Sequence, residues 1–416
     1  MKHRITPRSP ANTRERSITM RTKIAVLVVT LGVAALAAGC GGDDDEAASG
    51  EGPIRIGGIF DLTGPTSDVG VAYADGIKAY VDQLNSDGGV EGREIELISD
   101  DYAYEVPQAE QLYSRLKSEE VLAIQGWGTG DTEALSPQVN QDQIPYLSAS
   151  YSTNVADPAE TPFNFIPGMT YSDQIRVLLD YIAEQSGGEP TEVAVFHNDS
   201  PFGESPLEDG QAHVEEQGYE IGYETYAMPA EATDYASELS RAEQQGAEWI
   251  IVQNVATPSA QLAKDVQAQG IDATVLCLVY CSDEVYAELA GPAGDGTIGI
   301  FPFAAVNADA PGLERVAEAI GSEQELQQTN VHYVQGYYTM HALAEGIRSL
   351  LESGEELTGD SLRATLEELE PIDTGEVTSE FDWTEEFHAA LTSSPLYELE
   401  GGQWEQIQDP VAPAGS

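Results

Sequence analysis

The sequence predicts an α/β protein with two parallel β-sheets, each covered by helices on both faces. Short apolar runs alternate with longer segments whose apolar residues recur at helical spacing, and this alternation occurs in two tandem units. A proline-rich stretch at 158–167 separates the units. Strict alternation of this kind is typical of open parallel sheets with helices on both sides. The length of 416 residues also favours two domains over one.

The first unit opens with an apolar run at 54–59, which we expect to form a buried strand. Val69, Tyr73, Ile77 and Val81 follow at helical spacing, and Gly88-Gly89 ends that helix. The later strands of this unit are expected at 94–98, 121–125 and near 146–147, and its later helices at about 107–117 and 131–141.

The second unit repeats the pattern. Its strands are expected at 193–196, 221–225, 249–252, 274–278 and 297–300. Its helices are expected at 172–184, 204–217, 235–245, 258–269 and 282–290. The alternation then stops, with helices expected at 330–351 and 360–369 and a hairpin-like tail that contains Phe381-Asp382-Trp383.

Parallel sheets of this kind bind ligands at the carboxyl ends of their strands. The loops to inspect are those after Phe60, Gln125, Leu147, Phe196, Gln253 and Leu278. If two lobes face each other with these loops inward, they form a cleft that can close on a small molecule.

The N-terminus has the parts of a secretory signal. A basic segment at 21–23 precedes an uncharged apolar run at 24–38, and Gly39-Cys40 follows. Residues 36–40, Leu-Ala-Ala-Gly-Cys, resemble the lipobox of bacterial lipoproteins, although its commonest form has leucine three residues before the cysteine, where this chain has Ala37. A transmembrane helix is the alternative, but the apolar run is shorter than the roughly 20 residues that a span needs.

We therefore expect residues 1–39 to be a lipoprotein signal peptide, Cys40 the lipid attachment site and residues 40–52 an acidic tether. The protein would be exported and held at the outer face of the cell membrane by its lipid alone. Met20 could equally begin a complete signal, so the true start is either Met1 or Met20.

The charge balance is strongly acidic, with 72 Asp and Glu against 18 Lys and Arg and a net charge of −54. Nucleic acid is excluded as a natural partner, because phosphate contacts need clustered Lys and Arg. The chain is 41% hydrophobic with periodic apolar residues, so we expect a folded protein with an acidic surface rather than disorder. Salt would screen its self-repulsion, and we expect stability to rise with salt.

Cysteine and histidine are sparse. Cys277 and Cys281 could pair outside the cell if the chain turns between them, since one straight strand would hold them too far apart; they could equally be free thiols. The six histidines are scattered without paired spacing, so we expect no metal site, and we expect no cofactor.

Several segments resemble one known family. Residues 54–65 (Ile-Arg-Ile-Gly-Gly-Ile-Phe-Asp-Leu-Thr-Gly-Pro) are similar to the opening strand and loop of type I periplasmic binding proteins of the branched-chain amino acid and amide group. Residues 85–93, 99–101 and 198–203, and Ala290-Gly291 with Gly296, continue the resemblance, which covers nearly all of 53–410.

This resemblance implies two Rossmann-like lobes joined by crossover hinge strands. Lobe 1 would comprise 53–168 with 304–371, and lobe 2 would comprise 169–303 with 372–412. It also implies a monomer that delivers a small solute to the permease and ATPase subunits of an ABC importer. A ligand-sensing receptor component of the same fold is the alternative.

The resemblance also implies site residues. Thr129 matches the family position whose hydroxyl binds the ligand carboxylate, and the glycines and helix-start amides of residues 126–132 favour an anion. Ser150 and Ser152 match the next loop, and Phe202 matches an aromatic that covers the ligand. The other predicted wall residues are Trp127, Gly128, Tyr151, Asn254 and Tyr280. A tight turn that contacts nothing is the alternative for the glycine loop.

Two departures from the family bear on the solute. The acid that pairs with an α-ammonium in the amino-acid binders has no counterpart in residues 278–281, and Val69 replaces a common aromatic. A buried ammonium without a partner would be costly, so an amide, an aromatic acid or another short carboxylate fits better than an α-amino acid. Asp61, Asp101, Asp131, Asp199 and Asp283 could instead suit a cation or polyamine.

Catalysis is not expected. The sequence has no G-x-S-x-G elbow and no nucleophile–base pair with diagnostic spacing. The glycine loop also matches neither the dinucleotide pattern nor the P-loop pattern, so we predict a binding protein rather than an enzyme.

Overall fold

The computed structural model describes residues 52–415 apart from residue 231. The proposed signal peptide, Cys40 and nearly all of the acidic tether lie outside these residues. Among the described residues the strands form two separate sheets. The predicted α/β class with parallel sheets is confirmed.

The first sheet has five strands within the described part of the chain, in the order β2-β1-β3-β4-β5, and all its pairings are parallel. Its register places Ile54 beside Ile95 and Gly126 beside Ser148. These strands are β1 (Ile54–Phe60), β2 (Ile95–Asp101), β3 (Ala123–Gly126), β4 (Tyr146–Ser148) and β5 (Asn164–Phe165).

The second sheet has seven strands in the described residues, in the order β12-β11-β10-β9-β8-β6-β7. The five from β10 to β7 are parallel, whereas β11 and β12 form an antiparallel hairpin that adds to β10. These strands are β6 (Thr191–Asn198), β7 (Ile221–Met228), β8 (Trp249–Gln253), β9 (Thr274–Cys277), β10 (Ile298–Ile300), β11 (Ser394–Glu400) and β12 (Gln403–Val411).

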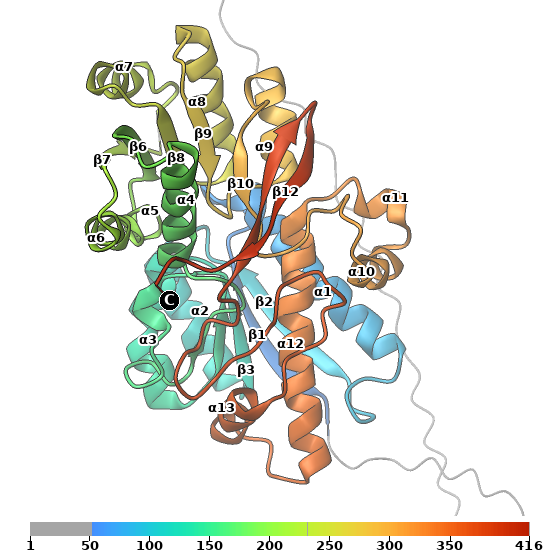
Figure 1. The fold of residues 1–416 in the computed structure, drawn as a ribbon. Coiled ribbons are helices and arrows are strands. Elements are labelled where there is room, and N and C mark those ends of the chain that lie inside the picture. The colour runs from blue at the N-terminus through green and yellow to red at the C-terminus, as the bar shows by residue number, and fades with distance from the viewer. Residues whose placement is uncertain (1–51, 231, 416) are drawn as a thin grey trace, which may run out of the picture. The chain divides into compact units, whose positions relative to one another are not determined.

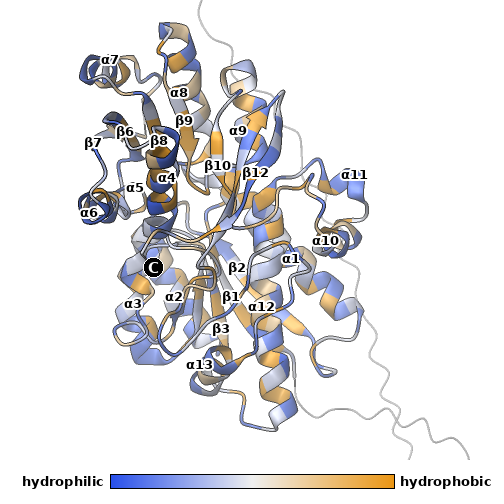
Figure 2. Cartoon of the chain, viewed as in Figure 1, coloured by the Kyte–Doolittle hydropathy of each residue, from blue (hydrophilic) through white to orange (hydrophobic). Residues whose placement is uncertain are grey.

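Helices flank both sheets, with α1, α2, α3 and α12 beside the first and α4 to α9 around the second (Figure 1). Figure 2 shows hydrophobic residues concentrated in strands such as β3 and β9, with hydrophilic residues on the outer helices. The helices are α1 (Ser67–Ser86), α2 (Val106–Ser118), α3 (Thr129–Asp142), α4 (Tyr171–Gln185), α5 (Pro201–Glu204), α6 (Leu207–Gln217), α7 (Ala236–Gln245), α8 (Ala256–Gln269), α9 (Glu284–Ala290), α10 (Gly312–Ile320), α11 (Glu323–Leu326), α12 (Val331–Ser353) and α13 (Gly359–Glu368), with 3-10 turns at Thr153–Val155 and Gly291–Ala293.

Helices α1 and α12 approach each other through two glycines. A Cβ on Gly76 would lie 2.0 Å from the carbonyl oxygen of Tyr333, and a Cβ on Gly336 would lie 2.0 Å from that of Tyr73. Both positions therefore exclude any larger residue, because the atoms in the way are main chain. This close packing fixes the long helix α12 against the helix that follows β1.

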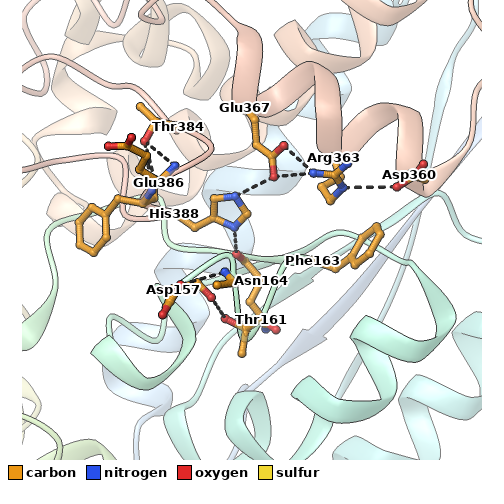
Figure 3. Close-up of polar contacts among 12 residues, drawn as sticks. Asp157, Thr161, Phe163, Asn164, Asp360, Arg363, Glu367, Thr384, Glu386 and His388 are labelled. Carbon is orange, nitrogen blue, oxygen red and sulfur yellow. Dashed lines mark hydrogen bonds and ion pairs between the residues drawn. The ribbon is translucent and has the colours of Figure 1, made fainter.

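The chain segment before β11 returns to the edge of the first sheet. His388 is buried there, and its Nδ1 lies 2.8 Å from the carbonyl oxygen of Asn164 while its Nε2 lies 3.1 Å from Glu367 Oε1 (Figure 3). Glu367 also pairs with Arg363 at 2.5 Å. The lobe bounds stay a prediction, because residues 372–412 contact the first sheet here and the second sheet through β11 and β12.

Three differences from the sequence prediction have local causes. The helix expected at 204–217 begins later, at Leu207 of α6, because Pro206 has no N–H to continue a helix, and the separate short helix α5 ends at Glu204. Strand β5 lies inside the proline-rich stretch and is too short to leave a periodic pattern. Helices α10 and α11 were not predicted at all, although α10 is amphipathic with Leu313 and Val316 buried.

Candidate functional site

The glycine loop after β3 is held by a chain of hydrogen bonds. The Trp127 indole N–H donates to Thr66 Oγ1 at 2.8 Å, and Thr66 Oγ1 donates to Asp61 Oδ2 at 2.7 Å. Gly128 must be glycine, because a Cβ there would lie 2.4 Å from both Asp131 Oδ1 and the Tyr102 hydroxyl. The loop thus presents the start of α3 in a fixed position.

Two hydroxyls meet at that helix start. Ser150 follows β4, and its Oγ donates to Thr129 Oγ1 over 2.9 Å; both side chains are buried. The N-terminus of a helix offers free backbone N–H groups and a partial positive charge. Thr129 and Ser150 therefore form a hydroxyl pair suited to a carboxylate or an amide oxygen.

An aromatic group from the other half of the molecule covers this pair. Tyr171 begins α4, Phe202 lies in α5 and Tyr280 follows β9. The Tyr280 ring lies 5.4 Å from Trp127 and 5.8 Å from Phe202, and Tyr171 lies 5.5 Å from Phe202, each measured between ring centroids. The loops of the two sheets are therefore in direct contact.

A cavity of about 10 Å³ remains between them. A water molecule needs roughly 10–15 Å³ on this scale, so a solute cannot fit unless the aromatic group moves away. The arrangement is a closed cleft. The lining residues are Thr66, Tyr104, Trp127, Gly128, Thr129, Ala149, Tyr171, Phe202, Val255 and Tyr280.

Five predicted site residues lie in this lining: Trp127, Gly128, Thr129, Phe202 and Tyr280. Ser150 lies immediately behind it, bonded to Thr129. That they bind a solute stays a prediction.

The other three predicted residues lie elsewhere. Ser152 caps the Thr153–Val155 turn and donates to Glu133 Oε1 at 2.7 Å. The Tyr151 hydroxyl accepts a hydrogen bond from Gln335 Nε2 at 2.6 Å and does not line the cavity. Asn254 lines a separate, larger cavity. Sequence reasoning missed Thr66, Tyr104, Ala149, Tyr171 and Val255, although Thr66 follows the glycine–proline turn after β1.

A buried ion pair supports Tyr280. The His332 ring stacks on Tyr280 with centroids 5.2 Å apart, and His332 Nε2 lies 3.2 Å from Asp283 Oδ2. Burial favours neutral imidazole, but the hydrogen bond and charge of Asp283 outweigh it and raise the pKa of His332. His332 Nδ1 lies 2.9 Å from Gln335 Oε1, and the Gln335 Nε2 group donates to the Tyr280 hydroxyl at 3.0 Å.

Asp283 is therefore engaged and is not free to bind a ligand ammonium. Its Oδ1 also accepts the Tyr286 N–H at 2.6 Å as the N-cap of α9. In the first loop, Asp61 accepts from Gly64 and Thr66, and Asp101 accepts from Leu62 and Thr63, so these two carboxylates hold loop structure.

Asp131 lies beside the hydroxyl pair, but its carboxyl group repels a bound anion only weakly. Burial raises its carboxyl pKa to about 7, and the Tyr102 hydroxyl donates to its Oδ1 at 2.7 Å. This raised pKa weakens the negative charge beside the hydroxyl pair near neutral pH.

Other features of the described residues concern chemistry outside the cleft. Cys277 and Cys281 are buried free thiols, which decides between the two alternatives that the sequence left open. No group of three or more His, Cys, Asp or Glu among the described residues is arranged to hold a metal ion. Within that same part of the chain, no helix has the length and apolar character needed to cross a bilayer.

Two α/β units whose strand-end loops meet over a small enclosed cavity define a two-lobed solute-binding protein. Residues 53–403 match the sequence model of a periplasmic binding protein family, which covers well over half of the chain. The chain therefore belongs to the periplasmic binding protein family.

The individual relatives have low sequence identity to this chain but align over most of its length. A Leu/Ile/Val-binding protein homolog 7 from Brucella suis is 23% identical over 361 residues, covering 83% of this chain and 86% of that protein. A branched-chain amino acid ABC transporter structure from Thermus thermophilus with bound valine has a TM-score of 0.81 and 24% identity, covering 88% of this chain and 98% of that one. A substrate-binding protein of an ABC transporter from Aeropyrum pernix has a TM-score of 0.79 and 29% identity, covering 88% and 97%. These are binding proteins, in agreement with the prediction that the chain is not an enzyme.

Proposed function

We propose that this chain is the extracytoplasmic substrate-binding component of an ABC importer, and that it captures a small solute bearing a carboxylate or amide. The single observation that carries the proposal is the Thr129–Ser150 hydroxyl pair at the start of α3, covered by aromatics from the other lobe. By name, the relatives described above are a Leu/Ile/Val-binding protein homolog and ABC transporter components, which supports the transporter role. The lobes open to admit the solute and close on it.

The solute lacks an α-ammonium group in this proposal. An α-ammonium needs a carboxylate partner in a dry site, and Asp283 is already paired with His332. Leucine should therefore bind more weakly than 4-methylpentanoate, which is leucine without its amino group.

Isothermal titration of residues 41–416 in high salt tests this. The panel holds leucine, valine, 4-methylpentanoate, 4-methylpentanamide and benzoate. Thr129→Val should weaken binding of the responding carboxylate by about 10-fold or more, since a hydrogen bond to a charged group contributes about 1.5–3 kcal/mol. Thr365→Val, on α13 and far in the chain from the site, is the matched control. Tight binding of leucine would contradict the proposal that the solute lacks an α-ammonium. If Thr129→Val bound the carboxylate as tightly as the wild type, the proposed site would be wrong.

Attachment through a lipid on Cys40 is part of the same proposal. The basic, apolar and small-residue segments before Cys40 support it. In a bacterial host, the wild-type chain should fractionate with membranes and incorporate labelled palmitate. Cys40→Ala should do neither, and palmitate incorporation by Cys40→Ala would contradict the assignment.

A further inference from the structure

A second cavity lies beside the closed cleft. It measures about 530 Å³, within the range of roughly 300–1,000 Å³ typical of small-molecule sites. Pro65 and Ser67 line it on one side, and they flank Thr66 of the inner cavity in sequence; Val255 lines both cavities. The two spaces are therefore neighbours across Thr66 and Val255.

Both halves of the molecule build this cavity. Asp68 comes from the first turn of α1, which follows β1 of the first sheet. Asn198, Met228 and Asn254 come from the carboxyl ends of β6, β7 and β8, and Gln261 comes from α8. Strand ends of parallel sheets are where ligands bind, and this cavity collects three of them.

Asp68 gives the cavity its chemical character. Its Oδ2 accepts the Thr257 N–H at 3.0 Å, which joins α1 to the start of α8, but its Oδ1 is buried and has no hydrogen-bond partner. A buried carboxylate oxygen without a donor is costly, and burial raises the pKa of Asp68. No lysine or arginine lines the cavity.

Two asparagines of the wall are already hydrogen-bonded. Asn254 Oδ1 accepts from Asn198 Nδ2 at 3.0 Å, and Asn198 Oδ1 accepts from the Ser200 hydroxyl at 2.6 Å. The rest of the lining combines proline, methionine, alanine and valine side chains with neutral polar ones. Asp68 is thus the one charged side chain among the described residues of this wall.

We propose that this cavity is a subsite for the far end of an elongated solute, which places a protonated amine, a guanidinium or an amide N–H group against the Asp68 carboxylate. The inference rests on the proposed function, because Thr129 and Ser150 hold the carboxylate end of the same solute. It adds the substrate class: a carboxylate separated from a terminal nitrogen donor by a short apolar chain. The donor at Asp68 also reinforces closure, since Asp68 already contacts α8.

Titration calorimetry with matched probes tests the subsite: hexanoate, 6-aminohexanoate, 4-guanidinobutanoate and butylamine. The wild-type chain should bind 6-aminohexanoate at least about 10-fold tighter than hexanoate. Asp68→Asn, which keeps the size and can still accept from Thr257, should abolish that ratio and leave hexanoate within about 2-fold. Gln261→Trp, which narrows the cavity from α8, should weaken 6-aminohexanoate more than hexanoate; it serves if Asp68→Asn fails to fold.

The outcomes separate this inference from the proposed function. If Thr129→Val weakens hexanoate but Asp68→Asn does not change the ratio, the subsite is overturned and the proposed function stands. If carboxylates do not bind but butylamine binds to the wild-type chain and not to Asp68→Asn, the proposed function fails and the cation subsite stands. If no probe with a nitrogen donor binds more tightly than the matched probe without that donor, the subsite is overturned, whether or not the carboxylates bind.

Discussion

The hydroxyl of Tyr280 donates a hydrogen bond to the carbonyl oxygen of Ala149, with 2.5 Å between the two oxygen atoms. Ala149 follows β4 of the first sheet and Tyr280 follows β9 of the second, so this bond joins the two halves at the cleft. Gln335 of α12 donates to the same hydroxyl at 3.0 Å. Tyr280 thus links the two halves across the cleft and occupies space that a solute would need.

Tyr280→Phe should loosen the closed form. The substitution leaves the buried Ala149 carbonyl and Gln335 amide without this partner, at a cost of about 1–3 kcal/mol in the free energy of unfolding. Small-angle scattering of the solute-free variant should give a larger radius of gyration than the wild type. Tyr286→Phe is the control, since its buried hydroxyl bonds Thr297 within the second half at 2.8 Å. It should lose similar stability at an unchanged radius, and an unchanged radius for Tyr280→Phe would contradict the role given to Tyr280.

Gly336→Ala should be strongly destabilising. The added Cβ would lie 2.0 Å from the Tyr73 carbonyl oxygen, so α1 and α12 must separate, and overpacking of this kind typically costs about 1–3 kcal/mol or more. Gly130→Ala in α3 is the matched control, because its new Cβ would meet nothing closer than Val106 at 3.7 Å. It should be neutral or slightly stabilising. Urea unfolding measures both, and equal midpoints for the two variants would argue against close helix packing.

Two features could be predicted well from the sequence. The order of strands and helices follows from apolar periodicity. The resemblance to the family predicted Thr129 and Phe202 as site residues, and these two residues and Tyr280 lie together in loops that the strand-end rule also selects. Neither inference needs to know which helices pack together. The bounds of most elements are accordingly within a few residues of those expected.

The features that the sequence did not predict depend on partners far apart in the chain. Gln335 contacts Tyr151 across 184 residues, and no local pattern signals that contact. Asp283 pairs with His332 only because α9 and α12 meet. The lack of a carboxylate in residues 278–281 therefore could not indicate that the nearby carboxylate of Asp283 was already engaged. Ser152 follows the right strand, but a local turn takes its hydroxyl as a cap.

The two buried cysteines should be unreactive in the native protein. Burial raises the pKa of Cys277, and the thiolate is the reactive form. Residues 41–416 should show no reaction with a thiol reagent over minutes when native and two reactive thiols when unfolded, and reductant should not change the melting temperature. Ser353→Cys, at an exposed position in the last turn of α12, should react at once and is the positive control. Loss of melting temperature on reduction would instead indicate a disulfide.

The buried imidazole of His388 should make stability depend on pH (Figure 3). Burial lowers the pKa of His388, so the unfolded chain, with a histidine pKa near about 6.5, takes up a proton before the native chain does. The native state therefore loses stability as the pH falls through and below this value. His388→Gln keeps a polar side chain beside Asn164 and Glu367 but does not titrate. The stability of the wild type relative to His388→Gln should thus be greatest near pH 7.5 and decrease toward pH 5.5, measured by urea unfolding at each pH. A difference that stays constant, or grows in acid, would mean that His388 is already charged in the folded protein.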